Sequence, residues 1–194
     1  MSEQAVMEPP KKEKTAQEKN AEINKRNANA EKQMEIMRRN ADAAKISSVK
    51  YKQETVTIAY GLIENNADNT ITLVSKDEPH AAFIDAMNAL APHVAEIIFH
   101  ASGEKTYQVN NIDVKGVNFD MKGDEFFAGI TSTLRLDNGK TTTLNTPPLP
   151  LSHPDPNVAR HTEEAAKAIE TVLRETRAFL GGRRAQGNLF AKLD

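Results

Sequence analysis

The hydrophobic pattern predicts a β-hairpin in the first half of the chain. Large apolar residues at positions 56, 58, 60 and 62 alternate with the small residues Thr57, Ala59 and Gly61, which is the period of a half-buried strand. A polar segment at residues 64–69 supplies the turn, and residues 70–74 supply the returning strand. We expect the folded part of the chain to begin near Ile46.

Strand patterns return further along the chain and predict the rest of a sheet. We expect a strand over residues 107–119, with a bend or bulge near Gly116, and another over residues 126–136. The dipeptide Asn138-Gly139 then predicts a hairpin turn, because Asn-Gly accepts the positive φ angles of type I′. Residues 141–144 form the returning strand.

An amphipathic segment between the two groups of strands predicts a helix. Apolar residues from Phe83 to Ile98 keep a three- and four-residue spacing over more than four turns. Ser75 or Asp77 is the expected N-cap. Pro92 should kink this helix or split it in two, and the continuity of the apolar face favours a kink.

A second helix is predicted near the C-terminus. Five prolines make residues 145–156 extended and without regular structure. The helix begins at about Asn157 or Thr162, and Gly181-Gly182 ends it.

This order of elements predicts the fold class. We expect an α+β domain, in which an antiparallel sheet of about five strands has two helices packed on one face. The domain covers residues 46–182. A charged arm at residues 1–45 precedes it, and a docking tail at residues 183–194 follows it.

The arm has a composition that opposes independent folding. It is rich in Lys, Glu, Asn and Ala and has no aromatic residue, so we expect it to be flexible or a frayed helix. Self-association through residues 23–44 is an open alternative, because a thin stripe with alternating three- and four-residue spacing runs along them. The stripe, interrupted by Asn27, consists of Ile23, Ala30, Met34, Met37, Ala41 and Ala44.

Composition narrows the classes of function. The net charge is −2 at pH 7, which gives no overall signature of polyanion binding. The chain has no cysteine, so disulfides and thiolate metal sites are excluded. The N-terminal residues have no signal-peptide pattern, and the apolar stretches fall short of the ~20 residues that span a bilayer. We expect a cytoplasmic protein that does not contact a membrane.

The sequence has no recognisable motif for catalysis or cofactor binding. The histidines lack metal-binding spacing, and His93 and His100, seven residues apart, make a poor metal site. No serine lies in a Gly-x-Ser-x-Gly motif, and no phosphate-binding glycine loop occurs. We expect a non-catalytic protein without metal or cofactor. A carboxylate-dependent hydrolase or nuclease stays as an alternative, because such a site leaves little local signature.

Four arginines near the end of the last helix are candidate nucleic-acid contacts: Arg174, Arg177, Arg183 and Arg184. Arginines at this end of a helix also complement its dipole, which is a purely structural explanation. Aromatic residues on the predicted strands are not interleaved with basic ones, which favours core packing over base stacking: Tyr60, Tyr107, Phe119, Phe126 and Phe127. Because the basic residues could still contact phosphates, single-stranded DNA binding through the sheet and the basic arm stays as the alternative function.

The tail carries the most informative peptide, Gln186-Gly187-Asn188-Leu189-Phe190. Leu189 and Phe190 either pack back on the domain or insert into a partner. The peptide resembles the motif by which many bacterial replication and repair proteins dock on the sliding clamp. Gln186, Leu189 and Phe190 match that motif, whereas Gly187 and Asn188 depart from it. In that family the Leu-Phe pair fills a hydrophobic pocket and the Gln hydrogen-bonds beside it.

Several segments together resemble an uncharacterised family of proteins in tailed bacteriophages and prophages. The resemblance covers roughly residues 46–190 and implies expression in the cytoplasm of a bacterial host, alongside DNA replication or recombination functions. The segments are residues 77–80, 91–93, 114–119 and 144–147, and the ending Gly-Arg-Arg-Ala-Gln-Gly-Asn-Leu-Phe. We expect a non-catalytic phage accessory protein that docks on the host sliding clamp through its C-terminal peptide.

Overall fold

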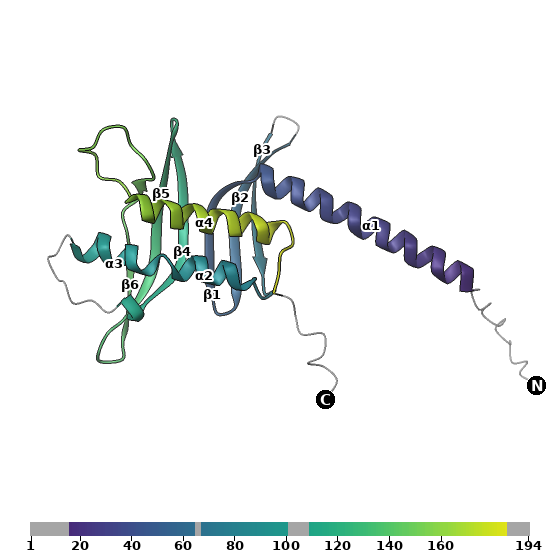
Figure 1. Ribbon diagram of the computed structural model, residues 1–194, viewed down its shortest axis with the longest axis horizontal. Helices are drawn as coiled ribbons and strands as arrows, with labels where there is room; N and C mark the ends of the chain where they lie inside the picture. Colours follow the sequence, from purple (N-terminus) through teal and green to yellow (C-terminus); the bar gives the residue numbers. More distant parts are fainter. Residues whose placement is uncertain (1–15, 65–66, 101–108, 186–194) are drawn as a thin grey trace, which may run out of the picture. The chain divides into compact units, whose positions relative to one another are not determined.

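A computed structural model describes residues 16–64, 67–100 and 109–185 of the chain (Figure 1). The chain divides into two compact units, Met1–Ile36 and Met37–Asp194. Helix α1 (Ala16–Ala43) begins in the first unit and ends in the second. The described part of the arm is therefore helical, which was one of the two predicted states.

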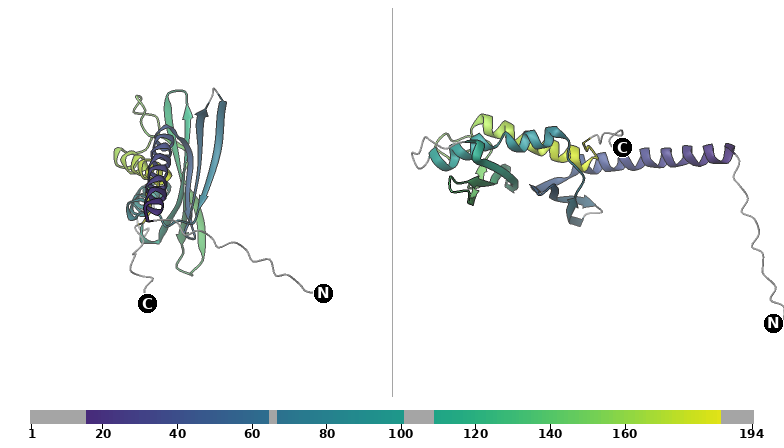
Figure 2. Two further views of the ribbon diagram at one scale, coloured as in Figure 1. Left: turned by 90° about the vertical axis from the view of Figure 1, so that its right-hand side faces the viewer. Right: turned by 90° about the horizontal axis from the view of Figure 1, so that it is seen from below.

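The second unit is built on one antiparallel sheet (Figure 2). Its strands follow the order β3-β2-β1-β4-β5-β6, and β7 pairs with β5. The α+β class and the antiparallel pairing are confirmed, with seven strands in the described residues where about five were expected. The strands are β1 (Lys45–Lys52), β2 (Thr55–Glu64), β3 (Ala67–Ser75), β4 (Ile112–Lys122), β5 (Glu125–Arg135), β6 (Thr141–Asn145) and β7 (Leu149–Pro150).

Two of these strands were not predicted. β1 lies in the middle of the sheet, between β2 and β4. Its register shifts between Ile46 and Ser48, so the buried residues Ile46 and Val49 lie three apart and do not alternate. The short strand β7 lies inside the proline-rich segment that was expected to be without regular structure.

β4 has the predicted bulge but begins later than expected. A 3-10 helix (Val109–Asn111) precedes the strand. The register between β4 and β5 shifts between Val114 and Gly116. At Gly116 the backbone approaches β1 so closely that a Cβ atom would lie 2.7 Å from the carbonyl oxygen of Val49. Glycine is therefore required at this bulge.

The hairpin turn after β5 differs from the predicted type. Gly139 has φ of 76°, and its N–H donates to the carbonyl of Leu136 at 2.9 Å. Type I′ requires positive φ at both central residues, and Asn138 does not have it. The turn is a three-residue loop closed by a left-handed glycine. The positive-φ pair that type I′ requires occurs instead at Gln53 and Glu54, between β1 and β2, with φ of 50° and 59°.

The amphipathic segment forms two helices, α2 (Ala81–Asn88) and α3 (Ala91–His100), so the preference for a kinked helix was wrong. Pro92 lies in the first turn of α3, where its missing N–H costs no helical hydrogen bond. The N-cap of α2 is His80, whose Nδ1 accepts from the Ala82 N–H at 3.2 Å, in place of Ser75 or Asp77.

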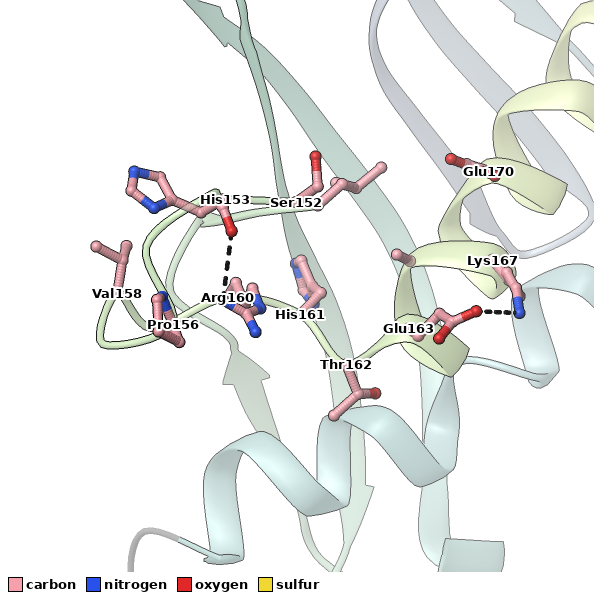
Figure 3. A pocket seen from close by; sticks show the side chains of 12 residues that line it. Ser152, His153, Pro156, Val158, Arg160, His161, Thr162, Glu163, Lys167 and Glu170 are labelled. Carbon is pink, nitrogen blue, oxygen red and sulfur yellow. Dashed lines mark hydrogen bonds and ion pairs between the residues drawn. The ribbon is translucent and has the colours of Figure 1, made fainter.

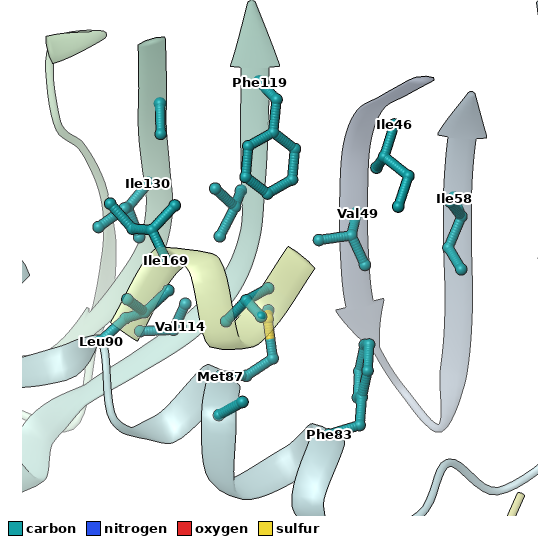
Figure 4. Packing of buried hydrophobic residues seen from close by; sticks show 14 of the residues in the cluster. Ile46, Val49, Ile58, Phe83, Met87, Leu90, Val114, Phe119, Ile130 and Ile169 are labelled. Carbon is teal, nitrogen blue, oxygen red and sulfur yellow. The ribbon is translucent and has the colours of Figure 1, made fainter. Parts of the chain in front are cut away.

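Helix α4 (Glu163–Leu180) agrees with the second predicted helix and ends at Gly181. It lies with α2 and α3 on one face of the sheet, where the core forms (Figures 2 and 4). Phe83 contacts Phe179 with ring centroids 6.0 Å apart and meets Tyr51 of β1 edge-on at 6.2 Å. These contacts join α2 and α4 to each other and to the sheet.

Among the described residues, Ala81–Phe99 has the length and composition of a membrane-crossing helix. The chain breaks between α2 and α3 within this stretch, and Phe83, Leu90 and Val94 are buried in the core. Its apolar face is therefore accounted for by packing against the sheet.

Candidate functional site

The chain beyond α4 folds back onto the domain. Gly182 has φ of 95°, and the Arg183 N–H donates to the carbonyl of Ala178 at 2.9 Å, which closes the helix end. The Ala185 N–H then donates to the carbonyl of Glu78 at 3.0 Å, and Arg184 forms an antiparallel bridge with Pro79. We call residues 183–185 the C-terminal anchor.

Arg183 links the anchor to two elements of the domain. One guanidinium nitrogen lies 3.0 Å from the carboxylate of Glu175, a buried residue of α4. Another lies 3.1 Å from Nδ1 of His80, the N-cap of α2. Arg183 therefore supplies the closest positive charge to a buried carboxylate and also joins α4 to the start of α2.

Arg184 binds on the other side of the anchor. Its guanidinium carbon lies 3.5 Å from the centroid of the Phe179 ring, and it donates to the Phe179 carbonyl. Its Nε donates to Asp77 at 3.2 Å. A hydrogen bond from Ser75 and the Arg184 guanidinium lower the pKa of Asp77. These contacts connect the anchor to the segment between β3 and α2.

The four arginines proposed as nucleic-acid contacts therefore do not form one free basic patch. Arg174 lies 3.6 Å from Glu175, which brings it next to Arg183, whereas Arg184 pairs with Asp77. Arg177 is half-buried, and its Nε has no hydrogen-bond partner among the described residues. The sequence showed the cluster, but it did not show which acidic side chains lie beside it.

The predicted docking residues Gln186, Leu189 and Phe190 lie outside the described residues. The last described residue, Ala185, is held by its backbone on Glu78. The predicted tail at residues 183–194 thus begins with three residues that belong to the packed domain.

Core packing accounts for two of the aromatic residues considered for base stacking. Phe119 is buried and stacks on Phe126, with ring centroids 5.7 Å apart. Phe127 points to the other face, where Lys122 Nζ lies 4.9 Å from its ring centroid. Tyr60 is half-buried against the core, and Tyr107 lies outside the described residues.

Sequence reasoning missed a groove of about 810 Å³ beside the first turns of α4 (Figure 3). The loop after β7 forms one wall and is held by contacts within the loop and by a contact to the start of β5. His153 lies 3.2 Å from Glu125, and Arg160 donates to the carbonyls of His153 at 3.3 Å and Asp155 at 3.2 Å. The lining includes Ser152, His153, Arg160, His161, Glu163 and Lys167.

His161 is the buried histidine of this groove. Its Nε2 lies 2.9 Å from the carbonyl of Ala128, so Nε2 carries the proton and donates. Its Nδ1 is buried without a hydrogen-bond partner among the described residues. Burial lowers the pKa of His161, and proximity to His93 lowers it further, while the bond to Ala128 opposes this shift.

Three polar side chains that line the groove are engaged in contacts within the fold. Thr162 uses its hydroxyl to cap α4, accepting from the Ala165 N–H at 3.2 Å. Glu163 and Lys167 pair with each other at 2.6 Å, which cancels their charges at the mouth of the groove. The described part of the chain has no group of three or more side chains arranged to hold a metal ion.

Comparison with known proteins finds no family model, no curated protein and no solved structure that matches this chain. The candidate site therefore rests on the residues themselves: the C-terminal anchor and the peptide that follows it.

Proposed function

We propose that this protein is a non-catalytic phage accessory protein that docks on the host DNA sliding clamp through residues 186–190. The observation that carries the proposal is the position of the anchor. The backbone is hydrogen-bonded to the domain up to Ala185, and Gln186, the first residue of the clamp-like motif, comes next.

An anchored start suits a docking peptide. Binding a short peptide costs conformational entropy, and a fixed residue directly before the peptide lowers that cost. In the proposed complex Leu189 and Phe190 fill a hydrophobic pocket of the clamp, and Gln186 hydrogen-bonds at its edge. The anchor then transmits the attachment to the folded domain through Arg183 and Arg184.

The contacts of the basic and aromatic residues support docking over the competing proposal of single-stranded DNA binding. Arg183 and Arg184 pair with acidic side chains of the same domain. Phe119 and Phe126 stack on each other on the core side of the sheet. A gel shift with a labelled oligonucleotide separates the two functions, because DNA binding through phosphates weakens as salt rises.

The test is a calorimetric titration of the full chain into a purified bacterial sliding clamp. We expect binding that falls at least ~10-fold when Leu189→Ala and Phe190→Ala are combined, because anchor residues carry most of the energy of such contacts. Lys192→Ala, in the same segment but outside the motif, is the matched control and should bind like the unchanged chain. Equal affinity of the double variant would overturn the proposal.

A further inference from the structure

The two edges of the sheet differ in how well they are protected against further strand pairing. At one edge, β6 has five residues and β7 has two, and both pair with β5. Pro147, Pro148 and Pro150 lie in or directly before β7, and proline has no N–H to donate to another strand. At the other edge, β3 pairs with β2 over nine residues without a bulge or a proline (Figure 1). Among the described residues β3 pairs on one side only, so it offers a regular row of backbone groups to another strand.

Apolar side chains are exposed along this edge. Val74 is 63 % exposed and Ile71 is 36 % exposed. They point to opposite faces of the sheet, because successive side chains of a strand alternate. Ile71 shares the helix-covered face with Leu73, which pairs with the buried Ile58 and is itself only partly buried. The core therefore ends at β3 with apolar surface that an added strand would cover.

The sequence of β3 is complementary to itself in one antiparallel register. With Thr72 opposite Thr72 of a second copy, Ile71 faces Leu73 of that copy on the helix-covered face. In the same register Lys76 faces position 68, which is an aspartate. Lys76 directly follows the strand, is exposed, and has no ion pair among the described residues. Two-fold symmetry repeats each contact, so the register forms two apolar pairs and two pairs of opposite charge.

We propose that β3 pairs with β3 of a second copy of this chain, antiparallel and centred on Thr72, so that the two sheets join into one. The charges select this register. Moving the centre by one residue puts Asp68 opposite Val74 in one direction and Lys76 opposite Thr70 in the other, and both charge pairs are lost. The same charges favour a second copy over an unrelated strand, because both ends of β3 then find an opposite charge at the same time.

Single-cysteine cross-linking tests the register directly, because the chain has no cysteine. Residues directly opposite each other in an antiparallel pair lie about 5 Å apart, a distance that a disulfide can bridge. Thr72→Cys should therefore give nearly complete covalent dimer on mild oxidation of the full chain. Thr70→Cys is the matched control, because it is the same residue type on the same face of the same strand and is also exposed. It should stay uncrosslinked, since the two copies of residue 70 lie about 13 Å apart along the strands.

Charge reversal gives a second readout by light scattering. The unchanged chain should have about twice its monomer mass of 21.4 kDa. Asp68→Lys brings like charges together at both ends of the paired strands and should raise the dissociation constant of the dimer by about 10-fold. Adding Lys76→Asp restores opposite charges and should restore the dimer. Adding Lys140→Asp instead gives the same net charge, but Lys140 lies in the turn before β6, so this control should stay as weak as Asp68→Lys alone.

Three results would overturn the proposal. One is a monomer at concentrations of about tens of micromolar, and another is equal cross-linking at positions 72 and 70. The third is a double charge reversal that dimerises no better than the Lys140→Asp control. Circular dichroism checks that each variant is folded, and the two cysteine variants change only exposed threonines, so they keep the register testable on a folded domain.

Discussion

Removing Arg183 tests whether the C-terminal anchor is part of the folded domain. Arg183→Ala deletes the guanidinium that lies 3.0 Å from Glu175 and 3.1 Å from His80. Glu175 stays in the core with a side chain that is 8 % exposed, and its remaining partner, Arg174, lies 3.6 Å away. The variant therefore leaves a buried carboxylate with one weaker partner.

The size of the effect follows from burial. Removing one partner of a fully buried ion pair costs about 3–5 kcal/mol, because the other charge stays buried without compensation. Arg183 is 44 % exposed, so water screens the pair, and we expect a loss of about 1–2 kcal/mol in the free energy of unfolding. Arg174→Ala is the matched control. Arg174 is 70 % exposed and more distant from Glu175, so its loss should cost less than about 0.5 kcal/mol.

Urea denaturation of the full chain measures both values. Arg183→Ala should lower the urea midpoint by about 0.5–1 M, whereas Arg174→Ala should leave it nearly unchanged. Combining Arg183→Ala with Glu175→Gln should recover part of the loss, because the charge left without its partner is then gone. The same midpoint for Arg183→Ala and the unchanged chain would refute the view that the anchor stabilises the domain.

Three further substitutions or conditions probe other features of the domain. Gln53→Asn with Glu54→Gly should raise the free energy of unfolding by about 1 kcal/mol in urea melts, because both positions have positive φ in the type I′ turn between β1 and β2. Gly116→Ala should lower it by about 1–3 kcal/mol, because the new methyl group meets the backbone of β1, and a midpoint within error of the unchanged chain would contradict this. Burial lowers the pKa of His161, so the unfolded chain takes up a proton there first. Neutral His161 should therefore make its full contribution to the free energy of unfolding above the ordinary histidine pKa of about 6.5, and this contribution should be lost progressively as pH falls below that value. In His161→Gln the free energy of unfolding should depend less on pH in this range.

Local periodicity accounts for the parts of the fold that could be predicted. The β2–β3 hairpin and α4 alternate or repeat their apolar residues without interruption, and each ends at a residue typical of a turn or a helix stop. β1 was not predicted because its bulge places Ile46 and Val49 on one face at a spacing of three. A bulge depends on the neighbouring strand, so the pattern of a single strand does not reveal it.

The division of α2 from α3 has a similar cause. Both helices bury one continuous apolar face, which makes a kink and a break look alike in the sequence. The distinction lies in two residues, Ala89 and Leu90, between the helices. The cap at His80 was missed because serine and aspartate are much commoner in that position than histidine.

The anchor shows why the candidate site could be predicted only in part. A local pattern correctly marks Gly181-Gly182 as the end of α4, and the chain beyond it then reads as a tail that leaves the domain. Arg184 donates to Asp77, which lies 107 residues earlier in the sequence, and Arg183 contacts His80, which lies 103 residues earlier. Such pairs arise only when α4 packs beside α2 on the sheet. They change the interpretation of the arginines, because side chains that hold the segment before Gln186 support a docking peptide better than a surface for DNA.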